Sequence, residues 1–347
     1  MSRDLRPSGV GIVFVVAVVV GLLSGCVISP RRGGTGGTNP PPPGGAGKLY
    51  VTNEDSNQVL RFDGVLTATG NLTPAATISN SAQISAPQYL AIDAVNNRLY
   101  VATSGAVLVY DQASTKNGSV NADRTIGGLT APQDLALDRG HDLLYVADSG
   151  TVRVFSGASS ANGSPAPART IVPQVAGSGI VVSAIFLDTV NDRLYIADSL
   201  NAAVDIYDGA NTLNGNVNAN RSLSGPSTGL ARPEGVQVDA IGRLIVANNN
   251  PPSITIYPNA ATVTGDLAPT STVRGASNTL QGPSQIFVTT GNELYVADGV
   301  QGAVPIFAGF NAANGTISPT RNITGSKTTI TTAGRSTVRG LALDATR

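Results

Sequence analysis

Apolar and polar residues follow one another along this chain in a block that recurs at a nearly fixed interval. A short apolar run beginning Leu-Tyr stands at 49–50, 99–100, 144–145, 194–195 and 294–295, and Leu244-Ile245 occupies the remaining place. The intervals between successive runs are 45 or 50 residues. Self-similarity at a period of this size indicates an array of one repeated supersecondary unit.

Each unit contains four patterns typical of short strands. It opens with a continuous apolar run ending in Asp, as at 87–93 and 132–138, which is typical of a strand buried on both faces. The Leu-Tyr run follows, and a third run ends in an aromatic residue such as Tyr110 or Phe155. A loop with Asn-Gly or Thr-Gly then leads to a fourth short run. Gly suits a turn that needs a positive φ, and the six loop glycines are Gly70, Gly118, Gly163, Gly215, Gly265 and Gly315.

Four strands per unit predict an all-β fold, a six-bladed β-propeller of four-stranded antiparallel blades over residues 49–347. The recurrent aromatic residues are then expected in the core between blades. The first unit begins at Leu49 and lacks an opening strand, whereas an unpaired opening pattern stands at 338–344. We therefore expect the C-terminal strand to join the first blade, because this closes the ring and leaves no open sheet edge.

The first 48 residues have a different composition. Arg3 and Arg6 precede an apolar stretch at 10–23, as in a secretion signal, although residues 10–28 are also long enough for a membrane-spanning helix. Gly and Pro dominate the region that follows, which cannot build a core and suits a tether. We expect a signal peptide at 1–25 and a tether at 26–48.

The signal region ends in Leu23-Ser24-Gly25-Cys26, which resembles the bacterial lipobox. The resemblance implies cleavage before Cys26 and a lipid on its sulfur, so that Cys26 contacts the membrane. Val27 replaces the Asp that often retains such lipoproteins at the inner membrane. We expect an exported protein, lipid-anchored in the cell envelope at the outer membrane.

Charge and composition narrow the possible partners. The chain has 22 Lys and Arg against 22 Asp and Glu, and this balance argues against nucleic acid. With 40 Gly and 21 Pro, it suits a turn-rich β protein outside the cytoplasm. We expect a monomer whose partner is a protein or a glycan.

The sequence motifs of the repeat resemble those of two families. Pro-x-x-x-Ala-x-Asp followed by Leu-Tyr-Val-Ala-Asp-Ser is similar to NHL propeller repeats, and Tyr50-Val51-Thr52-Asn53 is similar to the YVTN repeats of bacterial propellers. The likeness spans nearly all of 49–347. These families include binding scaffolds, surface-layer proteins and lactonase-like enzymes, so the fold does not select an activity.

Catalytic residue types are scarce. His141 is the only histidine, which excludes multi-histidine metal sites, and we assign no catalytic residue. The Asp residues that end the opening strands are predicted to accept turn N–H groups, as is the residue after each Leu-Tyr strand. The strand-ending acids are Asp93, Asp138, Asp188, Asp239 and Asp344.

Polar residues at one end of the central channel form the predicted binding site. The residues that follow each Leu-Tyr strand should share that end with the starts of the opening strands, which also include Ser183 and Ser284. The candidate channel-mouth residues are Gln88, Gln133, Asp148, Asp198, Glu234, Asn248, Asp298 and Arg339.

This end could also hold a metal ion. Glu234, Asp198, Asp148 and Asn248 offer the oxygen ligands that Ca²⁺ prefers. In residue types they are similar to the Glu, Asn and Asp around the divalent ion of lactonases of the SMP-30/gluconolactonase type. The alternative is a water-filled mouth without a cofactor.

Three functions fit these features. The first is a non-enzymatic envelope module that binds a protein or glycan, which the missing catalytic residues favour. The second is a Ca²⁺-dependent, lactonase-like hydrolase that uses Glu234. The third is a self-associating structural protein of the cell surface.

Overall fold

The computed structural model describes residues 47–312, 314–330 and 337–347. The chain divides into two units at Pro42, and every described strand lies in the second unit, Pro42–Arg347. The predicted lipidation site Cys26 and the predicted signal peptide lie outside the described residues. Among the residues described, no helix has the length and apolarity needed to cross a membrane.

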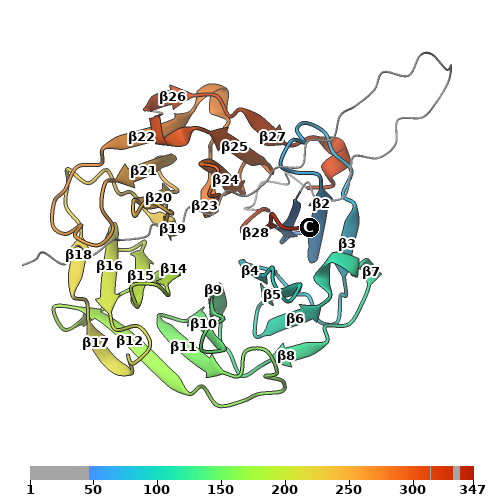
Figure 1. Cartoon of the computed structure of the whole chain (residues 1–347), viewed down its shortest axis with the longest axis horizontal. Coiled ribbons are helices and arrows are strands. Elements are labelled where there is room, and N and C mark those ends of the chain that lie inside the picture. Colours follow the sequence, from blue (N-terminus) through green and yellow to red (C-terminus); the bar gives the residue numbers. More distant parts are fainter. Residues whose placement is uncertain (1–46, 313, 331–336) are drawn as a thin grey trace, which may run out of the picture. The chain divides into compact units, whose positions relative to one another are not determined.

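The second unit is an all-β propeller of six sheets around a central channel, as predicted (Figure 1). Each sheet is built on four antiparallel strands, and three of the sheets gain one or two short strands at their outer edge. We number the sheets as blades in chain order. From the axis outward, blade 1 contains β28 (Leu341–Asp344), β1 (Lys48–Asn53), β2 (Gln58–Asp63) and β3 (Ala76–Ser79). Blade 2 contains β4 (Leu90–Asp93), β5 (Arg98–Ala102), β6 (Val107–Asp111) and β8 (Arg124–Ile126). Blade 3 contains β9 (Pro132–Asp138), β10 (Leu143–Asp148), β11 (Thr151–Ser156) and β12 (Arg169–Val175).

Blades 4 to 6 repeat this order. Blade 4 contains β14 (Val182–Asp188), β15 (Arg193–Asp198), β16 (Ala203–Asp208) and β18 (Arg221–Leu223). Blade 5 contains β19 (Pro233–Val238), β20 (Leu244–Asn248), β21 (Ser253–Tyr257) and β22 (Ser271–Gly275). Blade 6 contains β23 (Pro283–Val288), β24 (Glu293–Asp298), β25 (Val304–Ala308) and β27 (Arg321–Ile323). Four short strands lie at outer edges, namely β7 (Gly118–Ser119), β13 (Ser178–Gly179), β17 (Gly215–Asn218) and β26 (Gly315–Ile317). The described helical residues form four 3-10 turns, η1 (Ala113–Thr115), η2 (Ala276–Asn278), η3 (Phe310–Ala312) and η4 (Ser326–Thr328).

The C-terminal strand closes the ring as the sequence predicts. Strand β28 pairs antiparallel with β1, with Lys48 opposite Asp344 and Tyr50 opposite Ala342. Leu341 and Leu343 are at most 3% exposed and belong to the apolar cluster between blades 1 and 6. The last strand of the chain is therefore the innermost strand of its first blade.

The recurrent aromatic residues form the core between blades, which confirms their prediction. The tyrosines of the Leu-Tyr runs are at most 1% exposed. Three of them also donate a hydroxyl hydrogen bond to a backbone carbonyl of the next blade, at 3.0 to 3.2 Å: Tyr100 to Ala158, Tyr145 to Ala210 and Tyr195 to Ala260. The same side chain thus packs between two blades and ties them together through its polar end.

The six loop glycines have a role that the sequence pattern did not predict. Each has a positive φ, as expected, but each also pairs with the outermost strand of the preceding blade. Gly118 and Gly215 do so within β7 and β17, and Gly70 forms a bridge to Ile323 that joins blade 1 to blade 6. The Asn before the Gly can add a second bond, since Asn162 Oδ1 accepts the N–H of Thr125 at 3.0 Å. The loops therefore connect neighbouring blades around the whole outer edge.

Close approach of the inner strands explains two further glycines. A Cβ on Gly235 would overlap the Ser284 carbonyl oxygen, and a Cβ on Gly340 would overlap the Gln88 carbonyl oxygen and lie 2.7 Å from the Cα of Tyr89. Because these neighbours are backbone atoms, they cannot move aside by a change of rotamer.

We expect Gly340→Ala to lower the free energy of unfolding by about 1–3 kcal/mol, the usual cost of overpacking. Urea denaturation of wild type and variant measures this difference. Gly179→Ala is the control, because a Cβ there meets no atom within 4 Å. Equal stability of the two variants would contradict the close approach of the inner strands.

Candidate functional site

The central channel contains a polar cavity at one end, which we call the mouth cavity. Its volume is about 290 Å³. The structure brings five residues that the sequence predicted for this end into its lining: Gln88, Gln133, Ser183, Glu234 and Arg339. The remaining lining residues are Tyr89, Val181, Ser199 and Arg232.

Irregular pairing at the start of the inner strands places several of these side chains. In blades 4 and 5 the pairing register shifts between Val182 and Ala184 and between Pro233 and Gly235, so Ser183 and Glu234 are the extra residues. Such bulges bend the strand and redirect a side chain. Here they coincide with side chains that line the mouth cavity.

Two ion pairs balance the charges of the mouth cavity. Arg339 Nε lies 2.8 Å from Glu54 Oε2, and Gln88 Nε2 donates to the other oxygen of Glu54 at 3.2 Å. Arg232 Nε lies 3.0 Å from Glu234 Oε1. Burial raises the pKa of Glu234, whereas Arg232 and Arg339 oppose that rise. Glu54 was not predicted, because it lies one residue beyond the position that was compared between repeats.

Four predicted mouth residues lie elsewhere. Asp148, Asp198, Asn248 and Asp298 are at most 1% exposed and do not line the mouth cavity. Their oxygens accept N–H groups of the loop that leads into the inner strand of the same blade; Asp148 Oδ1, for example, accepts from Ala131 at 2.7 Å. This confirms the turn-capping prediction for these positions and corrects their placement at the channel.

The predicted Ca²⁺ ligands are not gathered at one point. Glu234 faces Arg232 in the mouth cavity, whereas Asp148, Asp198 and Asn248 are bonded to separate backbone loops. Within the described ranges, no group of three or more His, Cys, Asp or Glu side chains is arranged to hold a metal ion. The arrangement gives the Ca²⁺ site no support.

Other singled-out residues have structural partners. Buried Ser284 lies outside the mouth cavity, with its hydroxyl 2.9 Å from the carbonyl oxygen of Arg339. The strand-ending acids cap turns as predicted, since Asp93 and Asp138 each accept the N–H three residues ahead. Exposed His141 lies in such a turn, with Nδ1 2.7 Å from Asp138 Oδ2.

A polar network crosses the channel next to the mouth cavity, and Tyr89 belongs to both. It involves the third residue of the opening run in three blades, Tyr89, Asp134 and Gln285. The Tyr89 hydroxyl donates to the Glu234 carbonyl at 2.5 Å, and Gln285 Nε2 donates to the Leu90 carbonyl at 2.9 Å and to Asp134 Oδ1 at 3.3 Å.

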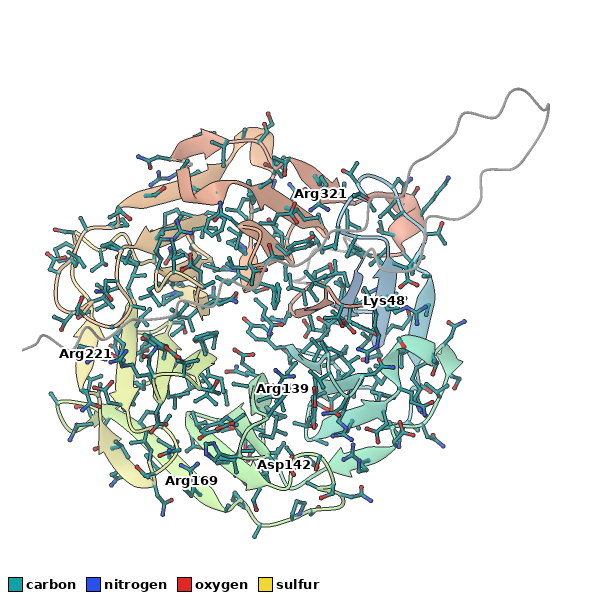
Figure 2. The ribbon with its side chains drawn as sticks, in the orientation of Figure 1. Lys48, Arg139, Asp142, Arg169, Arg221 and Arg321 are labelled. Carbon is teal, nitrogen blue, oxygen red and sulfur yellow. The ribbon has the colours of Figure 1, made fainter. Side chains whose placement is uncertain are left out.

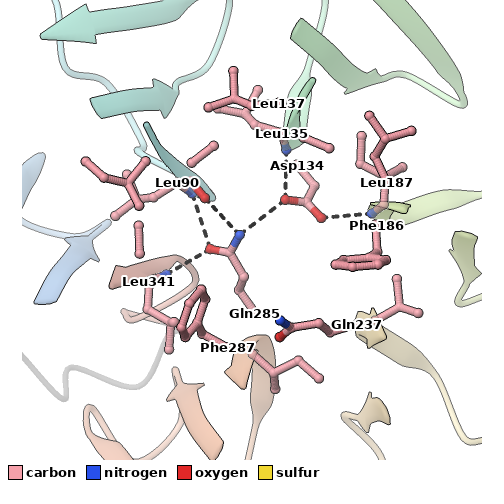
Figure 3. A pocket seen from close by; sticks show the side chains of 18 of the residues that line it. Leu90, Asp134, Leu135, Leu137, Phe186, Leu187, Gln237, Gln285, Phe287 and Leu341 are labelled. Carbon is pink, nitrogen blue, oxygen red and sulfur yellow. Dashed lines mark hydrogen bonds between the residues drawn. The ribbon is translucent and has the colours of Figure 1, made fainter. Parts of the chain in front are cut away.

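Backbone groups complete the network (Figure 3). Gln285 Oε1 accepts the N–H of Leu341 at 2.8 Å, and Asp134 accepts the N–H groups of Leu135 and Ile185, each at 2.8 Å. Together these bonds link the inner strands of all six blades. The sequence analysis did not predict these bonds. The available signal was the variation at this repeat position, which ranges from Gly to Tyr and holds one charged residue, Asp134.

Comparisons with known proteins support the fold. Residues 48–184 match the sequence model of a family described as lactonase, 7-bladed beta-propeller. A chain in the crystal structure of a nidogen/laminin complex is similar at 16% identity and a TM-score of 0.56. A protein of unknown function from Bacteroides caccae is similar at 9% identity and a TM-score of 0.59. Each likeness covers 86% of this chain and 98% of the other.

These similarities concern the fold of the chain. Identities of this size show the fold alone, and none of the proteins of curated function matches the sequence. The matched family is seven-bladed, whereas this chain forms six sheets. The matched region also ends before Glu234 and Arg339 of the mouth cavity.

Proposed function

We propose that this propeller is a binding module of the cell envelope, held there through a lipid on Cys26. It binds a polar segment of a protein or glycan at the mouth cavity. The observation that carries the proposal is the composition of this cavity, which combines amide and hydroxyl groups with two ion pairs. Among the described residues, no group of three or more His, Cys, Asp or Glu side chains at this cavity is arranged to hold a metal ion.

The exposed groups of the mouth cavity suit a hydrogen-bonding ligand. The side chain of Gln133 is exposed, and the Arg232 side chain is 60% exposed while it faces Glu234. Ser183 and Ser199 bond to each other at 2.6 Å. A ligand that exchanges bonds with these groups keeps them satisfied, which a purely apolar ligand cannot do.

We expect Arg232→Ala to weaken binding at least tenfold, because Arg side chains at the centre of an interface are frequent sources of binding energy. The test measures binding of the purified protein to isolated outer-membrane proteins, peptidoglycan and lipopolysaccharide. Arg139→Ala is a matched control, since Arg139 is 55% exposed and faces an acid, Asp93, but does not line the mouth cavity. An equal loss of affinity in both variants, or no loss in either variant, would contradict a binding site at the mouth cavity.

A lactonase is the second candidate, and the family match over residues 48–184 is the observation that favours it. Glu234, which is buried and has a raised pKa, is the acid of the mouth cavity that could act as a base. Hydrolysis of a panel of lactones by wild type, abolished in Glu234→Gln, would support this activity. Lack of hydrolysis by wild type would leave binding as the function of the mouth.

A further inference from the structure

A second cavity occupies the opposite part of the channel, and we call it the apolar cavity. Its volume is about 260 Å³, and it shares no lining residue with the mouth cavity. Each blade contributes an apolar residue to its lining, including Leu90, Leu135, Ile185, Val236, Phe287 and Leu341. Figure 3 labels Leu90, Leu135, Phe287 and Leu341 among them. Apolar pockets with a few converging polar groups are the usual form of small-molecule sites.

Asp134 is the charged group within this apolar wall. Its side chain is almost completely buried, and none of the ion pairs formed by the described residues includes it. Its contacts are all hydrogen bonds: Oδ1 accepts from Leu135 and Gln285, and Oδ2 accepts from Ile185. Burying a carboxylate without a cation is unfavourable. A cationic ligand would relieve this cost.

The hydrogen-bonding capacity of the surrounding groups leaves one position open. Gln285 already uses both N–H groups and receives two N–H groups on its oxygen, from Leu90 and Leu341. Asp134 Oδ1 accepts two bonds, whereas Oδ2 accepts one. Because a carboxylate oxygen offers two lone pairs, Asp134 Oδ2 can accept one more donor.

The other charged residue of the cavity is at its rim. Arg139 lies near the centre of the ring in Figure 2, is 55% exposed and already lies 3.7 Å from Asp93. An anionic ligand would therefore meet a cation that is hydrated and partly neutralised. It would also place its apolar end against the carboxyl of Asp134. The charges of the cavity favour a cation at its inner end.

We propose that the apolar cavity binds a small molecule with a primary ammonium group on an apolar body. The ammonium donates to Asp134 Oδ2, and the body packs against the apolar side chains of the inner strands. The cavity exceeds the roughly 150 Å³ of an engineered cavity that holds benzene, so a body of about six carbons fits. This site does not depend on the function proposed for the mouth cavity.

The test compares three probes with the same six-carbon body: hexylammonium, 1-hexanol and hexanoate. Isothermal titration uses the purified full-length protein, whose six blades are all present. We expect hexylammonium to bind at least tenfold more tightly than 1-hexanol, and hexanoate to bind more weakly than 1-hexanol. Hexylammonium and 1-hexanol should bind to Asp134→Asn with similar affinities. Asp123→Asn, in which the lost acid pairs with Lys116 away from the channel, should keep the preference.

Three results would overturn the proposal: equal affinities of wild type for the three probes, a preference for hexanoate, or no binding of any probe. A preference for hexanoate would instead assign an anion site at Arg139. The ranking in wild type is decisive by itself, so the test stands even if Asp134→Asn fails to fold.

Discussion

Removal of residues 338–347 is expected to prevent the propeller from forming a stable ring. The deletion removes β28, and with it the buried side chains of Val338, Leu341 and Leu343. Burial of three such side chains contributes roughly 5–9 kcal/mol. That is comparable with the whole stability of a typical domain, about 5–15 kcal/mol. The deletion also exposes the edge of β1, which can pair with another chain.

Solubility on expression and thermal denaturation measure this effect. The control is deletion of residues 345–347, which follow β28 and leave its pairing with β1 intact. We expect the longer deletion to give aggregated or unfolded protein and the shorter one to give folded protein. A soluble 338–347 deletion that melts near the wild-type temperature would show that β28 does not close the ring.

Asp134 is expected to make the protein less stable as the pH rises from about 4 to above 7. Burial raises its pKa to about 7 in the folded protein, although the N–H groups of Ile185 and Leu135 oppose the rise. In the unfolded chain its pKa is about 3.9. Below pH 4 both states hold the proton, and between the two values only the folded state does. The stabilisation that this proton gives the folded state is therefore fully present at low pH. It is lost as the pH rises through the folded-state value of about 7, and the free energy of unfolding falls by about 4 kcal/mol in total.

Urea denaturation of wild type and Asp134→Asn between pH 4 and pH 8 isolates this contribution. The variant loses a hydrogen bond at every pH, so this loss lowers its free energy of unfolding by a constant amount. The other carboxyl groups titrate in both proteins, so their effect cancels in the difference. The stability of wild type relative to the variant should fall by about 4 kcal/mol across the range. A difference that stays flat across this range would contradict the raised pKa of Asp134.

The repeats predicted the ring well because each blade carries its own copy of the local pattern. The unpaired pattern at 338–344 identified the partner of β1, since the first unit alone lacked an opening strand. The loop glycines were predicted as turns, yet Gly118 and Gly163 also pair with the preceding blade. Periodicity reports conformation within one unit, and it does not show which neighbouring strand a loop reaches.

The candidate site was predicted less completely. Residues such as Gln88 and Glu234 were placed at the mouth because every opening strand starts at the same end of the channel, although the bulge at Glu234 was not predicted. Asp148 and Asp198 were placed there too, but nearby N–H groups hold their carboxylates in buried loops. The role of Asp134 was missed because it arises only where six inner strands converge, and no single repeat contains that geometry.

Site-specific photocrosslinking in the envelope tests the central claim, that the mouth cavity is where the partner binds. A photoreactive phenylalanine derivative replaces Gln133, whose exposed side chain lines the mouth cavity. In a matched control it replaces Val190, which is 90% exposed in a turn at the opposite end of blade 4. The account predicts a discrete crosslinked species from position 133 and none from position 190. Crosslinking from position 190 alone, or from neither position, would contradict it.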